Sequence, residues 1–473
     1  MTLYESSRSE SRVGSWPGHR RIRASFWNCR ARGAAALVVA AVLHAHAASA
    51  GTCISPWQLR TGTALDDEIH AAVRDSDGNV YLGGFDDGLL NVENDWPVGG
   101  VSGFVEKRSN DGALLWRRVF DTAGIDLVEA LALDPARHRI VVAGRTDAAF
   151  AGTNAGQFDL FVAALDDETS AVLATGQFGD QFPQHPTAIA VLPSGNIVVA
   201  GSDDAFVQGN AVLGQPTLFV AGFAPDPQDP GTFVQSWWQQ PNEPDLMTPL
   251  SRAFALTAVG QDSEDVVVAT RSAARNAGAR LQRLDASGAA VWDRLMSPSP
   301  ADIVFGVAMS GSGRLYAAGT TGMALAGPPL GNTDGFLLEI DAASGDVLWG
   351  RQFGSAGVDW VSSLALDEGG NAFIGGFTDG VIVPGSLPAP HSIYALAFSD
   401  RGEPLSGWQT STPSPADFTD SLSIVPACDG RALIAGHVNG DLPGSPGLGR
   451  NDAVVVPAQL IGFADAIFAA GFE

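Results

Sequence analysis

Five aspartates recur along the chain, each shortly before an apolar stretch. Carboxylates that converge on one place repel one another, so such a set would attract a cation, with calcium the fitting cofactor, or a polar ligand. Alternatively, each aspartate accepts backbone N–H groups from its own loop, or a pair of them serves as acid and base on a glycan. The residues are Asp67, Asp126, Asp302, Asp359 and Asp417, with His185 at the corresponding position of another segment.

Other catalytic patterns are missing from the sequence. It contains no G-x-S-x-G nucleophile elbow, and the histidines after residue 50 show neither H-E-x-x-H nor another paired spacing typical of metal ligands. The segment from Asp75 to Asn79 resembles a calcium loop but lacks the terminal glutamate, which favours a hairpin turn. The motifs therefore indicate no hydrolase and no transition-metal enzyme.

The first fifty residues have the pattern of a signal peptide. Several arginines precede an apolar run from Ala34 to Leu43, and small residues follow up to Ala50. This apolar run is shorter than the roughly 20 residues that span a bilayer, and no later segment reaches that length without interruption. We expect cleavage near Ala50, a secreted or periplasmic protein and no membrane span.

Charge and cysteines fit that compartment. The formal net charge is −25, and residues 1–50 contain more basic than acidic residues, so the remainder is more acidic still. Nucleic acid and anionic membranes are poor partners for such a surface. Without the signal peptide two cysteines remain, Cys53 and Cys428, and in an oxidising compartment they predict one disulfide.

Seven short apolar runs recur about 60 residues apart, near the length of a four-stranded propeller blade. Each run is preceded by an apolar stretch with a tight turn, and is followed by a loop, another apolar stretch and a segment that usually carries tryptophan. We name these strands a to d in chain order, the runs being strand b. We expect the residues at their fourth positions to end strand b equivalently; these are Gly84, Gly144, Gly201, Thr270, Gly319, Gly376 and Gly436.

The count of strands predicts how the ring closes. Strands a, b and c occur seven times after residue 62, but strand d occurs only six times there. Residues 57–62, WQLRTG, have the pattern of a d strand. We therefore predict an all-β, seven-bladed β-propeller of four-stranded blades over residues 51–460, closed by this N-terminal strand in the last blade, with residues 461–473 as a tail. Eight blades or two smaller β domains are the alternatives.

The pattern resembles the bacterial seven-bladed propeller repeats called SBBP. The matching segments are LALDEGGNAFIGGFT, TDGFLLEIDAASGDVLWGRQFG and FVEKRSNDGALLWRRVF. This resemblance implies the fold and a secreted setting, and it brings no catalytic motif. The segment EIDAASGDVLW is also similar to the repeat of quinoprotein dehydrogenases, but the chain lacks their adjacent-cysteine disulfide and their eight-blade length.

These observations favour a binding or scaffolding propeller, expected to be a monomer, with a protein or carbohydrate ligand. Strand a of a propeller lines the central channel, so the aspartates and His185 should converge at one channel mouth, on the face of the d-to-a and b-to-c loops. A propeller enzyme such as a lyase, lactonase or glycosidase, with a carboxylate or metal site at that mouth, is the alternative.

Overall fold

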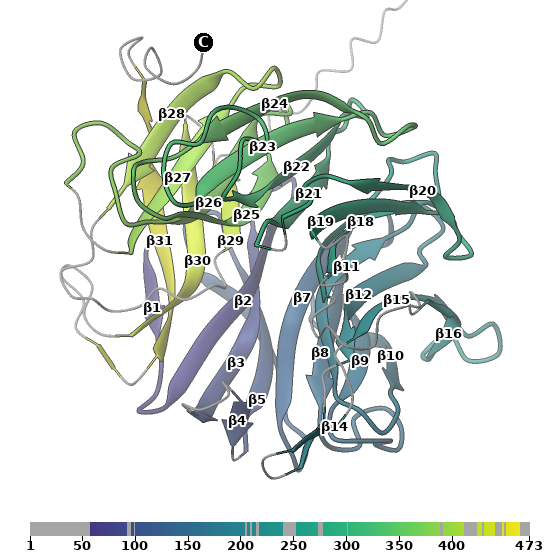
Figure 1. The fold of residues 1–473 in the computed structure, drawn as a ribbon. Helices are drawn as coiled ribbons and strands as arrows, with labels where there is room; N and C mark the ends of the chain where they lie inside the picture. The colour runs from purple at the N-terminus through teal and green to yellow at the C-terminus, as the bar shows by residue number, and fades with distance from the viewer. Residues whose placement is uncertain are drawn as a thin grey trace, which may run out of the picture. The chain divides into compact units, whose positions relative to one another are not determined.

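The structure is a computed structural model, and it describes residues 57–91, 96–98, 100–203, 206–208, 211–213, 217–239, 252–272, 278–299, 301–387, 391–410, 423–427, 430–439, 447–448 and 451–463. The chain divides into two units, Met1–Ala50 and Gly51–Glu473, and all described residues belong to the second. They form seven antiparallel sheets of four blade strands each, which confirms the predicted seven-bladed β-propeller (Figure 1). No helix among these residues is long and apolar enough to cross a membrane.

The first four blades each contain strands a to d in chain order. Blade 1 has β2 (Asp66–Arg74), β3 (Val80–Asn91), β5 (Ser102–Arg108) and β6 (Leu114–Phe120). Blade 2 has β7 (Asp126–Asp134), β8 (Arg139–Thr146), β9 (Asp159–Asp166) and β10 (Val172–Phe178), with a 3-10 turn η1 (Pro135–Arg137). Blade 3 has β11 (Gln184–Val191), β12 (Ile197–Asp203), β15 (Thr217–Pro225) and β16 (Phe233–Gln239). Blade 4 has β17 (Arg252–Ala258), β18 (Val266–Ser272), β19 (Gly278–Leu284) and β20 (Ala290–Leu295).

The last three blades continue the same order until the ring closes. Blade 5 has β21 (Ile303–Met309), β22 (Leu315–Thr321), β23 (Asp334–Ile340) and β24 (Val347–Phe353). Blade 6 has β25 (Asp359–Leu366), β26 (Ala372–Thr378), β27 (Ser392–Phe398) and β28 (Pro404–Gln409). Blade 7 has β29 (Ser423–Ala427), β30 (Arg431–Asn439) and β31 (Asn451–Gln459), and takes β1 (Leu59–Thr61) as its strand d.

Strand a of each blade contacts strand a of the next all the way round, from β2 through β7, β11, β17, β21 and β25 to β29 and back to β2. These seven strands therefore surround the central channel. The N-terminal strand closes the ring as predicted, because Leu59 pairs with Val455 and Thr61 pairs with Ala453. Arg60 reinforces this pairing by donating from Nε to Oδ2 of Asp452 over 2.9 Å, in a nearly buried ion pair.

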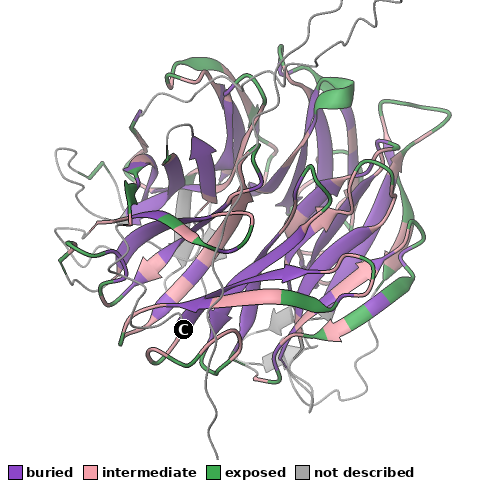
Figure 2. Cartoon of the chain, turned by 90° about the horizontal axis from the view of Figure 1, so that it is seen from above, coloured by how far each residue is buried: buried purple, intermediate pink, exposed green. Residues whose placement is uncertain are grey.

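The hydrophobic core lies between the blades. Seven clusters of buried side chains each join two neighbouring blades, one cluster for each contact in the ring. Strands b and c are covered on both faces, and β8, β12, β22 and β23 are buried at every residue, so their central residues read as short apolar runs. Strand d faces solvent on one side, and Figure 2 shows the exposed residues mainly in outer strands and turns.

The tryptophan of strand d joins one blade to the next. In blade 5, Trp349 packs so closely against the c-to-d turn of blade 6 that a Cβ at Gly402 would lie 2.5 Å from its ring, and the φ angle of Gly402 is 74°. Glycine is needed there on both counts. Blade 2 has Ala174 in place of tryptophan, and an isolated bridge between Thr175 and Thr232 joins it to blade 3 instead.

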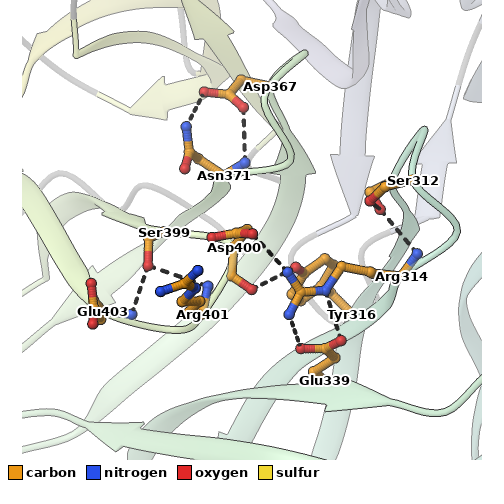
Figure 3. A network of polar contacts seen from close by, with 11 residues as sticks. Ser312, Arg314, Tyr316, Glu339, Asp367, Asn371, Ser399, Asp400, Arg401 and Glu403 are labelled. Carbon is orange, nitrogen blue, oxygen red and sulfur yellow. Dashed lines mark hydrogen bonds and ion pairs between the residues drawn. The ribbon is translucent and has the colours of Figure 1, made fainter. Parts of the chain in front are cut away.

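A second set of contacts between blades consists of hydrogen bonds from side chains of one blade to the c-to-d turn of the next. In blade 5, Arg314 donates to both carboxylate oxygens of Glu339 (2.8 and 2.6 Å) and to Asp400 of blade 6 (2.8 Å), and the hydroxyl of Tyr316 donates to the Asp400 carbonyl (3.0 Å; Figure 3). Corresponding donors are Lys107, which bonds the carbonyl of Asp167 over 2.9 Å, and Arg283, which bonds the carbonyl of Ala342 over 2.8 Å. This link therefore recurs at three contacts between blades.

Three short additions lie outside the four-stranded pattern. β4 (Trp96–Val98) pairs with β3, and β13 (Phe206–Gln208) pairs with β14 (Ala211–Leu213). β32 (Ile461–Gly462) adds a fifth strand to the outer edge of blade 6 by pairing with β28. The segment expected to be a tail after residue 460 thus begins as part of a sheet, because the outer edge of strand d offers free backbone groups.

Candidate ligand site in the central channel

Strand a carries the same β-bulge in six blades. In blade 1 the pairing with strand b shifts between Ile69 and Ala71, which leaves His70 as the extra, unpaired residue. A bulge of this kind turns its side chain away from the regular ladder. The bulge residues of blades 1 to 6 are His70, Glu129, Thr187, Phe254, Phe305 and Ser362.

The bulge explains the glycines of strand b. A Cβ placed on Gly376 would lie 1.9 Å from the carbonyl oxygen of Trp360, and one on Gly84 would lie 1.8 Å from that of Glu68. Five of the six glycines pair with the residue before the bulge, so their predicted equivalence is confirmed, although they lie inside strand b and not at its end. Thr270 holds this position in blade 4, and the strand a partner of Gly436 lies outside the described residues.

A cavity of about 400 Å³ lies in the channel and is lined by strand a of all seven blades. All six bulge residues line it. Blades 1 to 3 contribute charged and polar groups, blades 4 and 5 contribute phenylalanines, and blades 6 and 7 contribute serines. The volume is within the range of small-molecule sites.

Two carboxylates and a histidine form the centre of the charged part. Nδ1 of His70 lies 2.8 Å from Oε2 of Glu129, an ion-pair contact outside hydrogen-bond geometry, and its Nε2 lies 3.2 Å from Oε2 of Glu68. Arg145 donates from Nε to the other oxygen of Glu129 over 2.8 Å. Since both ring nitrogens of His70 face a carboxylate, the doubly protonated imidazolium fits this arrangement.

Further polar groups complete this cluster at its two sides. Asn451 donates from Nδ2 to Oε1 of Glu68 over 2.8 Å, and Nδ1 of His437 lies 3.4 Å from Oε2 of the same carboxylate. On the other side, Nε2 of His185 lies 3.5 Å from Oε1 of Glu129. The His185 side chain is 26% exposed, against 13% for His70 and 3% for His437. His185 is therefore the most accessible of these histidines.

Burial and ion pairing act in opposite directions on these groups. Burial acts to lower the pKa of His70, but Glu129 and Glu68 outweigh it and raise that pKa to about 10. Burial acts to raise the pKa of Glu129, but His70, Arg145 and His185 hold it well below its ordinary value. Burial likewise acts to raise the pKa of Glu68, and the neighbouring histidines and Asn451 lower it. All three groups are therefore charged at neutral pH.

Further aromatic rings pack against the aromatic part of the cavity wall. The rings of Phe254 and Phe305 meet edge to face at 5.3 Å between centroids. Trp360 packs against Phe305 at 5.2 Å and stacks on Phe377 at 6.0 Å with an interplanar angle of 12°. This chain of rings holds the two phenylalanines in place at the cavity wall.

The serine part holds hydroxyls that no described group satisfies. The Oγ atoms of Ser362 and Ser363 are buried and have no hydrogen-bond partner among the described residues. Both residues line the cavity. A buried hydroxyl in a structured wall ordinarily has a partner, so these two groups are the ones most able to receive a polar ligand.

The predicted aspartates lie elsewhere. Asp67, Asp126, Asp302 and Asp359 are at most 1% exposed and do not line the cavity. Oδ2 of Asp126 accepts the backbone N–H and the hydroxyl of Thr122 over 2.6 and 2.7 Å, and Asp359 accepts the same two groups of Ser355 over 2.5 and 3.0 Å. Each of these carboxylates thus holds its own d-to-a loop, which favours the structural explanation. Ligand binding by the aspartates stays a prediction.

One placement in the sequence analysis is wrong by a residue. Gln184, and not His185, occupies the position of the aspartates, because Pro186 is the residue that pairs with the strand b glycine in blade 3. His185 therefore lines the cavity, and it is the only one of the five predicted site residues in the described part of the chain that does so. Asp417, Cys53 and Cys428 lie outside the described residues.

The other candidate motifs have structural roles or no support. Asp75 accepts the backbone N–H groups of Asp77 and Asn79 over 3.0 and 2.8 Å, which confirms a hairpin turn. Among the described residues, no three histidine, cysteine, aspartate or glutamate side chains are placed to hold a metal ion. The calcium hypothesis therefore gains no support from this part of the chain.

The bulge residues were not among the predicted site residues. They follow the aspartate position by three residues, but they are of five different types in six blades, so a search for what repeats passes over them. A search for the position that varies most between otherwise regular repeats would have found them.

Comparison with known proteins agrees with the fold. Residues 348–382 match the SBBP β-propeller repeat family. This match and the seven blades support an SBBP-type propeller. No curated protein matches the chain.

Solved structures share only the general architecture. A quinohemoprotein alcohol dehydrogenase from Pseudomonas putida HK5 is 12% identical, with 87% of this chain and 76% of that chain covered and a TM-score of 0.45. Chaetomium thermophilum Raptor is 11% identical over 86% of this chain and 28% of its own, with a TM-score of 0.47. BamB from Moraxella catarrhalis is 14% identical over 86% and 99%, with a TM-score of 0.38. These likenesses carry no argument about function.

Proposed function

We propose that this SBBP-type propeller is a binding protein whose ligand occupies the channel cavity. The observation that carries the proposal is the bulge found in six blades, which presents six side chains of five different types to one cavity of about 400 Å³. The bulges and their glycines recur from blade to blade, whereas the side chains at the bulges do not. Variation confined to one cavity on a repeated scaffold is typical of a recognition site.

The charged cluster supports the same proposal. Burying charged side chains costs free energy, and hydrophobic residues in their place often stabilise a fold equally well or better. The side chains of Glu68 and Glu129 are only 8% exposed, yet both stay charged beside His70. A functional site is where such a cost is commonly retained.

Binding fits the ionisation states better than general acid–base catalysis does. A general acid or base works best with a pKa near the operating pH. His70, with its pKa raised to about 10, holds its proton at neutral pH, and the lowered pKa of Glu129 leaves that carboxylate without one to give. Within this cluster, the pair of His185 and Glu129 favours the alternative of a propeller enzyme. The imidazole of His185 is partly exposed, and its Nε2 lies 3.5 Å from Oε1 of Glu129.

We also propose that the protein acts outside the cytoplasm. The arginines, apolar run and small residues of positions 1–50 support export with cleavage near Ala50. N-terminal sequencing of protein recovered from periplasm and medium tests this. A mature start close to residue 51 is the expected result, and an uncleaved N-terminus would contradict it.

A blocked cavity tests the binding proposal. Ser362→Trp places a large side chain at a bulge, and Ser76→Trp, in an exposed turn, is the matched control. Thermal-shift screening of neutral sugars, organic cations and organic anions should give hits for the wild type and the control that are lost with Ser362→Trp. Hits that bind all three proteins equally, or an absence of any hit, would overturn the proposal. Product analysis of each hit tests the enzyme alternative.

A further inference from the structure

This inference rests on the proposed function and names the ligand class. We propose that the cavity binds a neutral carbohydrate, with one face of a sugar ring on Phe254 and Phe305 and its hydroxyl groups bonded to His185, Glu129 and the serines of blade 6. The three kinds of wall, and their order around the channel, carry the argument.

The charges of the wall are already paired. His70 lies between Glu68 and Glu129, and Arg145 bonds the second oxygen of Glu129. A cationic ligand would have to compete with His70 and Arg145 for Glu129, and an anionic ligand would have to compete with Glu129 for His70. A neutral ligand leaves the pairs intact.

The polar atoms that remain suit hydroxyl groups. A carboxylate offers about four acceptor positions, so Glu129 retains capacity beside Arg145, His70 and His185. The hydroxyls of Ser362 and Ser363 can each donate and accept, and they have no partner among the described residues. A sugar hydroxyl also donates and accepts, so it can satisfy either side of the cavity. An apolar ligand would leave these groups buried without hydrogen bonds.

The aromatic wall suits the remaining face of a sugar. A pyranose carries hydroxyls around its edge and C–H groups on its faces, and such C–H groups pack on the electron-rich face of an aromatic ring. Phe254 and Phe305 come from neighbouring blades, and they lie between the Thr187 side and the Ser362 side of the ring. A sugar ring seated on them would therefore have polar groups on both flanks.

Isothermal titration of the full chain with neutral monosaccharides and disaccharides tests the inference, with choline and citrate as the charged probes. Phe305→Leu keeps an apolar side chain but removes the ring, and it should weaken sugar binding at least tenfold. His185→Ala should weaken it by a smaller factor, because a partly exposed donor is lost. Phe150→Leu, in an aromatic group outside the cavity lining, is the control and should bind as the wild type does.

The outcomes separate this inference from the proposed function. A sugar that binds the wild type and Phe150→Leu, and binds Phe305→Leu weakly, supports both. If choline or citrate binds and Ser362→Trp abolishes that binding while no sugar binds, the cavity is the site and the carbohydrate inference is wrong. If no probe depends on Ser362 or Phe305, both are wrong. Unchanged melting temperatures of the variants exclude unfolding as the cause.

Discussion

Two charged networks join neighbouring blades, and they differ in whether they recur. The Arg314–Glu339–Asp400 network of blades 5 and 6 lies beside a c-to-d turn (Figure 3). Glu339 is buried, whereas the side chains of Arg314 and Asp400 are 30% and 48% exposed. Donors equivalent to Arg314 reach the next blade's turn at two other contacts. In the cluster of Glu68, His70 and Glu129, the last two residues line the channel cavity, and the cluster has no counterpart in the described parts of blades 4 to 6.

The comparison separates assembly from recognition in a repeat protein. Each blade must stack on its neighbour in the same way, so the contacts that serve assembly recur. A ligand meets all blades at once from the axis, so the contacts that serve it differ from blade to blade. Variants of the two networks should therefore differ in size of effect, in pH dependence and in salt dependence.

The largest effect is expected from His70→Asn. Removing the imidazolium leaves two nearly buried carboxylates without their shared cation, so the free energy of unfolding should fall by about 3–5 kcal/mol. Urea denaturation measures it. His138→Asn, an exposed turn residue with a φ angle of 48° that asparagine tolerates, is the control and should be close to neutral. Equal losses of unfolding free energy in both variants would contradict a stabilising role of His70 between the two carboxylates.

A smaller loss should follow from raising the pH. His70 has a folded-state pKa raised to about 10, against 6.5 in the unfolded chain, so its contribution to stability is fully present below about pH 6.5 and is lost as the pH rises to 10. Glu68 and Glu129 have lowered pKa values, so their contribution is present above 4.5 and is lost in acid. Denaturation midpoints should decline on the alkaline side in the wild type, and this decline should be shallower in His70→Gln. Parallel curves would contradict this assignment.

Gly376→Ala tests the bulge, which belongs to the recurring features. The added Cβ would overlap the carbonyl oxygen of Trp360, so the strands must separate, at a cost of about 1–3 kcal/mol in unfolding free energy. Gly311→Ala is the matched control, because a Cβ there meets nothing within 4 Å and should change stability by less than about 0.5 kcal/mol. An unchanged unfolding free energy in Gly376→Ala would show that strand a accommodates the added Cβ at little cost.

The smallest effect is expected from Arg314→Ala. Its ion pairs are partly solvated, so the loss should be about 1 kcal/mol or less, and most of it should vanish in 1 M salt, where charges are screened over about 3 Å. His70→Asn should keep its effect in the same salt. If the loss of unfolding free energy in Arg314→Ala did not depend on salt, the two networks would not differ in how far solvent screens their charges.

The fold could be predicted from the sequence because its determinants are local and repeated. Turn glycines, apolar strands and tryptophans recur about 60 residues apart, and the surplus d-type segment before residue 62 predicted the closing strand. Even blade 4, where Thr270 replaces glycine, follows the expected order of strands. Local signals that agree over many repeats leave few alternatives.

The site could be predicted only in part, because its determinants are distant and irregular. Glu68 and Asn451 are 383 residues apart, and no local pattern announces their contact. The bulge also changes which residue faces the channel, and the alternation of side chains along a regular strand does not reveal this change. His185 was predicted to occupy the aspartate position of blade 3, which Gln184 holds instead. His185 lies one residue further along the strand and lines the cavity.

Ring closure by β1 also has a kinetic consequence. Blades 1 to 6 are built from consecutive hairpins, whereas blade 7 needs Arg60 and Asp452, which lie 392 residues apart, to come together. Contacts between residues so far apart in the sequence form slowly, because the chain must lose conformational entropy before the contacts can stabilise it. The open arc of six blades should accumulate first, and docking of β1 on β31 should be the late step of refolding. During synthesis, that step must wait until residues 451–459 have emerged.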